Sequence, residues 1–132
     1  MKATGALLMS LALSACNAED APSTVDYSTV EVPVERISSD EARGRGRTLF
    51  SKKCALCHGQ RADGRGARRE GLSGKPINFH NKEWRANSSP LSVFETLSEG
   101  KRGTSMPAWP TLNDEQKWDV VAYVLSVAED GP

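Results

Sequence analysis

The residues best suited to chemistry form one short run, Cys54-Ala55-Leu56-Cys57-His58. Two cysteines three positions apart at the end of a helix present both sulfurs to the same edge of a flat ring, so they can form thioethers with the two vinyl groups of a haem. The adjacent histidine then lies beneath the iron and offers its imidazole as a ligand. A C-x-x-C-H run is the attachment signal of c-type haem. We therefore expect one covalent haem c, attached through Cys54 and Cys57 and ligated by His58.

Two other kinds of site use a pair of cysteines at this spacing. A thioredoxin-like redox pair needs a surrounding βαβ pattern, and the chain shows no convincing strands. A zinc site needs a second pair of ligands, and His80 is the one other histidine. The histidine that directly follows Cys57 favours haem over both alternatives.

The third cysteine, Cys16, ends an apolar run at the amino terminus. A short positive start precedes that run, which is too short to span a bilayer. The string Leu13-Ser14-Ala15-Cys16 resembles the lipobox of bacterial lipoproteins. The resemblance implies that residues 1–15 are a signal peptide and that lipid on Cys16 anchors an exported protein on the periplasmic side of the inner or outer membrane. The alternative is a secreted protein cut at another small residue.

The composition divides the rest of the chain into a tether and a domain. Residues 16–38 carry prolines and many polar or acidic side chains without a helical period, which predicts a flexible tether. Residues 39–132 are long enough for one small domain. Residues 41–132 hold fifteen basic and eleven acidic side chains. Because this excess is small and the chain carries an export signal, nucleic acid is not an expected partner.

Around the C-x-x-C-H run, residues 40–128 resemble the class I cytochromes c. Gly46 and Phe50 stand eight and four residues before Cys54, where that family has a glycine and an aromatic residue. The resemblance implies an all-α, cytochrome c-like fold in which three or more helices and long loops wrap around one haem. Glycine inside a helix costs about 1 kcal/mol relative to alanine. We therefore expect Gly46 to mark a close approach of two helices.

The same resemblance suggests the second iron ligand. Met106 lies in Gly103-Thr104-Ser105-Met106-Pro107, which matches the family's distal loop, where a methionine thioether binds the iron. A rival ligand is His80, and the plain alternative is a methionine that fills a gap in the core. The position of Met106 just before the last helix favours it as the ligand.

Three further residues are candidate haem contacts. The family supplies a backbone carbonyl to the free nitrogen of the proximal histidine, and Pro76 is the candidate here. Trp84 and Trp109 either donate an indole N–H to a propionate or pack against the ring, and we expect packing.

Capping residues and apolar periodicity predict three helices that position these groups. One opens at a capping box over 38–41 and runs to about residue 51. A second begins at Ser89-Pro90 and stops at Gly100. The last is capped by residues 113–116, and its apolar positions recur at i, i+3, i+4 and i+7.

A strong ligand on each side of the iron leaves no open position for a substrate. We therefore expect an electron-transfer protein rather than an enzyme: a membrane-anchored, monohaem carrier of single electrons between respiratory or periplasmic redox proteins. Alternatives are a fixed haem c subunit of a dehydrogenase or oxidase, or a haem peroxidase or gas-binding protein. Basic side chains near the attachment site are predicted to dock acidic patches of the redox partners: Lys52, Lys53, Arg61, Arg65, Arg68 and Arg69.

Overall fold

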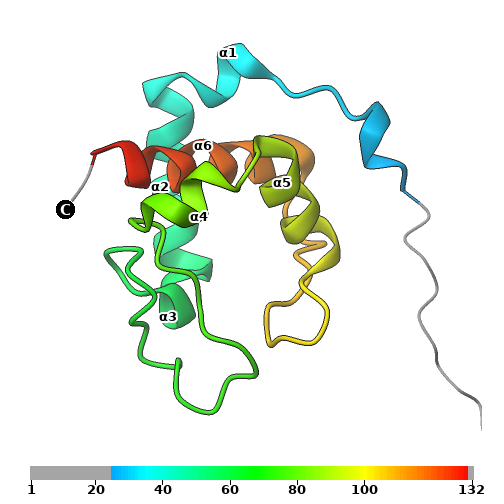
Figure 1. Ribbon diagram of the computed structural model, residues 1–132. Helices are drawn as coiled ribbons and strands as arrows, with labels where there is room; N and C mark the ends of the chain where they lie inside the picture. The colour runs from blue at the N-terminus through cyan, green and yellow to red at the C-terminus, as the bar shows by residue number, and fades with distance from the viewer. Residues whose placement is uncertain (1–24, 131–132) are drawn as a thin grey trace, which may run out of the picture.

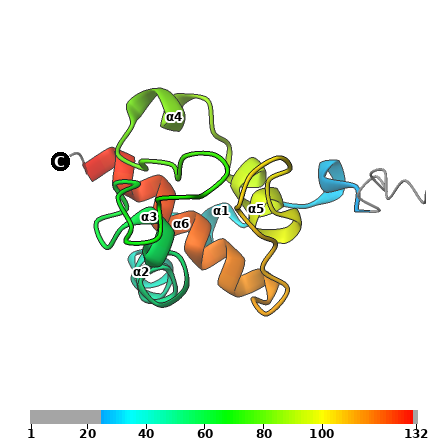
Figure 2. The ribbon, with the colours of Figure 1, turned by 90° about the horizontal axis from the view of Figure 1, so that it is seen from below.

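The computed structural model describes residues 25–130, and the side chains of residues 25–127. Every regular element in this part of the chain is helical, as predicted. Two long helices, α2 (Asp40–Lys53) and α6 (Asp114–Asp130), pack against each other, and α5 (Pro90–Glu99) packs on α6. Figure 2 looks along α2 and shows α6 running across it. Two short helices and long loops complete the body (Figure 1): α3 (Ala55–His58) and α4 (Lys82–Ala86).

The three longer helices begin within the predicted capping stretches, although the cap of α2 is Ser39 and not Ser38, the first residue of the predicted box. The Ser39 hydroxyl accepts a hydrogen bond from the N–H of Ala42 at the start of α2. At the start of α5, Ser89 forms a reciprocal capping box and Pro90 takes the first helical position. Asn113 caps α6, because its side chain accepts from the N–H of Gln116 at 2.9 Å. These bonds satisfy N–H groups that have no partner within a helix, so local sequence sets where each helix begins.

The crossing of α2 and α6 depends on Gly46. A Cβ atom at this position would collide with the backbone carbonyl of Asp119 and lie 2.9 Å from the Cβ of Tyr123. One turn further along α2, the ring of Phe50 packs edge-on against Tyr123, with centroids 5.2 Å apart. The close approach predicted for Gly46 is therefore present. It brings the end of α2, and with it the C-x-x-C-H run, to a fixed place beside α6.

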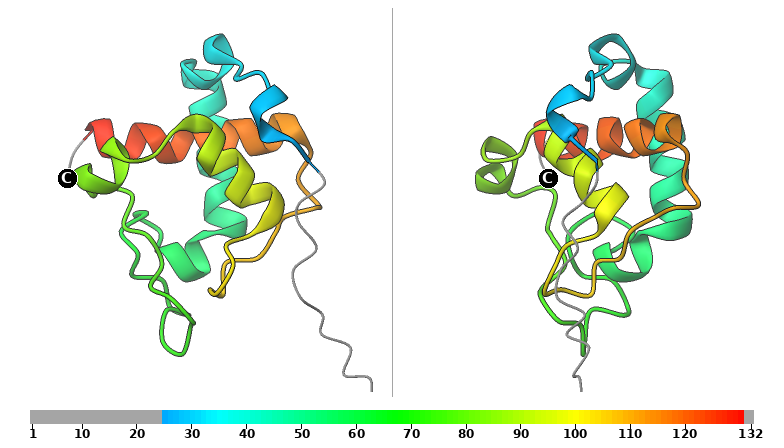
Figure 3. Two further views of the ribbon diagram at one scale, coloured as in Figure 1. Left: turned by 45° about the vertical axis from the view of Figure 1, so that its right-hand side comes forward. Right: turned by 90° about the vertical axis from the view of Figure 1, so that its right-hand side faces the viewer.

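A short segment ahead of α2 also packs on the helical body (Figure 3). It contains a 3₁₀ turn, η1 (Tyr27–Thr29), and one turn of helix, α1 (Val34–Ile37). The Tyr27 hydroxyl donates to Glu99 Oε1 at 2.7 Å, and its ring meets Phe94 edge-on at 6.5 Å. The expected flexible tether over residues 16–38 is therefore wrong for residues 25–38, where Tyr27, Val30, Val32 and Ile37 are partly buried against the core, although Val25 and Val34 are exposed. The predicted signal peptide, Cys16 and the rest of that tether lie outside the described residues.

An ion pair network holds this segment in place. The Asp119 carboxylate, whose side chain is only 4% exposed, accepts from Arg36 Nε at 2.9 Å and from Arg45 Nε at 2.8 Å. Burial raises the pKa of Asp119, but the hydrogen bonds from the two arginines outweigh burial and bring the pKa below its usual value of 3.8. Asp119 thus joins α1, α2 and α6.

Within the part of the chain that the structure describes, no helix combines the length and apolar character that crossing a membrane requires.

Substituting Gly46 by alanine should separate α2 from α6. We expect Gly46→Ala to lower the free energy of unfolding by about 3 kcal/mol, because the added methyl group has backbone in its way. Gly44 in the same helix is a matched control, since a Cβ there meets nothing within 4 Å. Gly44→Ala should raise stability by up to about 1 kcal/mol. Urea unfolding of both variants checks this, and equal effects would contradict the close crossing.

Replacing Asp119 should change how stability depends on pH. Because the folded-state pKa lies below 3.8, the carboxylate stabilises the fold fully above that value, and its contribution is lost as the pH falls through the folded-state pKa. Asp119→Asn should therefore cost about 2 kcal/mol at pH 7, and the difference from wild type should shrink by about pH 3. Glu70→Gln, which breaks an exposed pair with Arg69, should cost under about 0.5 kcal/mol. Urea unfolding at both pH values measures the contrast, and a pH-independent difference would contradict it.

Candidate functional site

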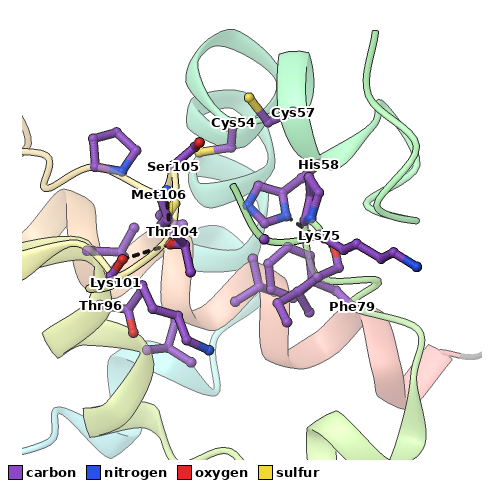
Figure 4. A pocket seen from close by; sticks show the side chains of 18 of the residues that line it. Cys54, Cys57, His58, Lys75, Phe79, Thr96, Lys101, Thr104, Ser105 and Met106 are labelled. Carbon is purple, nitrogen blue, oxygen red and sulfur yellow. Dashed lines mark hydrogen bonds between the residues drawn. The ribbon is translucent and has the colours of Figure 1, made fainter. Parts of the chain in front are cut away.

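One cavity of ≈ 420 Å³ lies at the centre of the fold. Its wall is built from the end of α2, from α3, α5 and α6, and from the loops around residues 72–79 and 101–109. This volume falls within the roughly 300–1,000 Å³ typical of ligand sites. Figure 4 shows that the predicted haem-binding residues Cys54, Cys57, His58 and Met106 reach the cavity from different elements. The cavity therefore brings together groups that are far apart in the sequence.

The two cysteines of the attachment run both line the cavity as free thiols. Cys54 stands at the junction of α2 and α3 and is buried, and burial raises the pKa of its thiol to about 11 despite the nearby charge of Lys53. Redox-active cysteine pairs instead rely on a lowered thiol pKa. Among residues 25–127, no group of three or more potential ligands gathers as a zinc site would require. Both alternatives to haem attachment lose support.

His58 is oriented by a backbone carbonyl. Its Nδ1 lies 3.2 Å from the carbonyl oxygen of Ile77, so Nδ1 carries the proton and Nε2 keeps a free lone pair. Burial lowers the pKa of His58, although the hydrogen bond to Ile77 opposes this, so the imidazole is neutral at pH 7. The ring is flanked by Phe79 at a centroid distance of 4.9 Å. A neutral imidazole with a free nitrogen in an apolar wall is suited to bind a metal.

The carbonyl that accepts the hydrogen bond from His58 belongs to the residue after the predicted one. Pro76 was expected to accept from His58, but its carbonyl faces Gly64, where a Cβ atom would lie 2.7 Å from it. Successive carbonyls in an extended loop point in different directions, so the next residue, Ile77, reaches the ring instead. Pro76 still lines the cavity.

Met106 reaches the cavity from the loop of residues 101–107, which we call the Met106 loop. In Figure 4 its side chain and the His58 ring approach from opposite sides. The carbonyl of Met106 accepts from the N–H of Lys101 at 3.0 Å, and its N–H donates to the hydroxyl of Thr104 at 3.2 Å. The rival His80 is not part of the cavity wall; its Nε2 instead lies 2.6 Å from the carbonyl oxygen of Arg61.

The two tryptophans that were candidate contacts both line the cavity. Trp84 packs edge-on against Phe79 with centroids 4.8 Å apart, which fits a packing role. The Trp109 indole N–H is buried and has no hydrogen bond partner in the structure. A buried donor without a partner is costly, so this group is suited to an acceptor on a bound molecule.

The basic side chains near the site differ from those predicted. Of the six proposed docking residues, Lys53 is the one that lines the cavity. Arg61 and Arg65 border a smaller hollow beside α3, and Arg61 pairs with Asp63 at 3.3 Å. Two lysines in the cavity wall were missed: Lys75 and Lys101. The sequence held a signal for both lysines, because each lies close to a candidate haem contact. Lys75 directly precedes Pro76, and Lys101 lies in the same loop as Met106.

The comparisons with known proteins agree with this geometry. The family described as cytochrome C oxidase, cbb3-type, subunit III matches residues 41–124. The chain belongs to this family. It is a c-type cytochrome domain, and the group implied for its cavity is haem c.

Relatives of this cytochrome domain include oxidase subunits and a smaller cytochrome. It is 32% identical over 82 residues to the cbb3-type cytochrome c oxidase subunit CcoP of Azospirillum sp. (strain B510), covering 61% of this chain and 27% of that protein. It is 37% identical over 84 residues to subunit FixP of Bradyrhizobium diazoefficiens, covering 63% and 27%. Cytochrome c55X of Stutzerimonas stutzeri is 33% identical over 86 residues, covering 63% and 62%. The chain thus spans about a quarter of the oxidase subunits it matches.

A solved structure supports the fold of the cytochrome domain. A chain of the Kuenenia stuttgartiensis reducing HAO-like protein complex superposes with a TM-score of 0.64 at 25% identity, covering 74% of this chain and 49% of that chain. The residues present fit a haem. The cavity offers two thiols on one edge, a neutral imidazole, a thioether from another loop and an unpartnered indole N–H. These groups suit the haem c that the family implies.

Proposed function

We propose that this cytochrome domain is a one-electron carrier with a single haem c. Cys54 and Cys57 would hold the ring as thioethers, and His58 and Met106 would ligate the iron. The observation that supports this best is the approach of an imidazole and a thioether to one apolar cavity from opposite sides. Strong ligands on both sides leave no position for oxygen, peroxide or a gas.

Each residue has a defined part in this role. The bound haem iron supplies one-electron redox chemistry. The carbonyl of Ile77 keeps the proton on His58 Nδ1, so Nε2 faces the cavity as a ligand. The soft sulfur of Met106 favours the ferrous state and raises the reduction potential. Phe50 and Phe79 keep water away from His58, against which both rings pack.

The comparisons favour the role of a component in a larger oxidase over that of a freely mobile shuttle. The matched family and two of the relatives described above bear the names of oxidase subunits. We propose that the domain passes electrons within or to such an assembly, on the periplasmic side of a membrane, with lipid on Cys16 as a further anchor. Stoichiometric co-purification with other redox subunits in mild detergent supports a fixed subunit, whereas release of this chain alone supports the mobile carrier.

Carbon monoxide tests the iron ligation. The reduced wild-type protein should show a low-spin c-type spectrum that carbon monoxide leaves unchanged, because Met106 occupies the sixth position. Met106→Ala should open that position and give a complete spectral change with carbon monoxide. His80→Gln is the matched control for the rival ligand and should behave as wild type. Ready binding of carbon monoxide by the wild-type protein would contradict the carrier function and favour a gas-binding or peroxidase role.

The three lysines of the cavity wall, Lys53, Lys75 and Lys101, make a positive rim that we propose docks acidic redox partners. Electron transfer from the reduced protein to ferricyanide, a trianion, probes this rim. The rate should fall as ionic strength rises, and the double variant Lys75→Gln/Lys101→Gln should be roughly fivefold slower at low salt. Arg68→Gln/Arg69→Gln, outside the cavity wall, is the matched control and should be slowed less. Equal slowing in both double variants would contradict a rim centred on the cavity.

A further inference from the structure

Two loops that are distant in the sequence meet at the cavity. The N–H of Ser105 donates to the carbonyl of Ser73 at 2.8 Å, and the N–H of Ser73 donates to the hydroxyl of Ser105 at 2.9 Å. The Ser73 hydroxyl also donates to the carbonyl of Gly103 at 3.3 Å. These three hydrogen bonds tie the Met106 loop to the loop of residues 71–77. We call them the Ser73–Ser105 latch.

The backbone beside the latch brings the two loops into contact. Gly74 has a φ of +79°, a conformation that favours glycine. A Cβ atom at Gly74 would lie 3.1 Å from Cγ2 of Thr104, one residue before Ser105. Both serines are exposed, but the latch lies beside this close contact between the two loops.

Each loop also contacts one of the two proposed iron ligands. The loop of residues 71–77 ends at Ile77, whose carbonyl accepts from His58. The other loop carries Met106 directly after Ser105. The turn around Met106 is otherwise closed by its own residues, through Lys101 and Thr104. The latch thus links the loop that orients the imidazole to the loop that presents the thioether.

We propose that Ser73 and Ser105 are positioning residues that keep the Met106 thioether at the iron. This inference rests on the proposed function, because it requires Met106 to be a ligand. Neither serine needs to touch the iron. When the latch opens, the Met106 loop is held by fewer contacts, and the thioether leaves more often. An external ligand then competes more easily for the vacated position.

Imidazole binding to the oxidised protein measures how often the thioether leaves. The double variant Ser73→Ala/Ser105→Ala removes two of the three hydrogen bonds and keeps the Ser105 N–H to Ser73 carbonyl bond. Hydrogen bonds of this kind are individually modest, so we expect the apparent affinity for imidazole to rise roughly three- to tenfold. The near-infrared band of sulfur-to-ferric ligation should persist at low temperature and disappear at a lower temperature than in wild type. Ser105→Ala alone should give a smaller change in the same direction.

A serine outside the latch provides the matched control. Ser51 is exposed on α2 and is not part of the cavity wall. Ser51→Ala should leave imidazole affinity within about twofold of wild type. If wild type shows the near-infrared band and the latch variants bind imidazole no better than Ser51→Ala, the latch is refuted and the proposed function stands. If wild type lacks the band, Met106 is not a ligand, and both proposals fail.

Discussion

The central cavity is the constraint on which the rest of the structure depends. Apolar side chains from three helices line it, among them Phe50, Leu97 and Val124, so part of the apolar surface of the domain faces the cavity and not another helix. Removing apolar surface from water is favourable, so the cavity favours a largely apolar group of matching size. The proposed haem c, held by two thioethers and two iron ligands, would fill this space and could not diffuse away.

Different parts of the fold position the two proposed iron ligands, His58 and Met106. The α2–α6 crossing at Gly46 fixes the end of α2, so the attachment run and His58 start from a rigid frame. The Met106 thioether instead comes from a loop that is stabilised by its own turn and by Ser73. One proposed iron ligand is thus placed by helix packing and the other by loop hydrogen bonds. In the proposed function, both kinds of contact together restrict the protein to outer-sphere electron transfer.

Features specified by neighbouring residues were predictable from the sequence. The C-x-x-C-H run, the caps Ser39, Ser89 and Asn113, and the role of Gly46 all depend on short spacings or on the cost of one residue type. The N-terminal segment was misjudged because its order comes from contacts such as Arg36 with Asp119, 83 positions apart. No local sequence pattern predicts a contact between residues so far apart in the chain. The shift from Pro76 to Ile77 has a similar cause, since the direction of a loop carbonyl depends on what the loop packs against.

The proposed function requires the Met106 side chain to lie against the haem. Proton NMR of the reduced protein tests it, because the ring current of a haem strongly shields any side chain held against its face. We expect one three-proton resonance far upfield of all other methyl signals, together with upfield methylene signals from the same residue, and we expect their loss in Met106→Ala. A reduced, fully haem-loaded wild-type protein without such a methyl resonance would contradict the account.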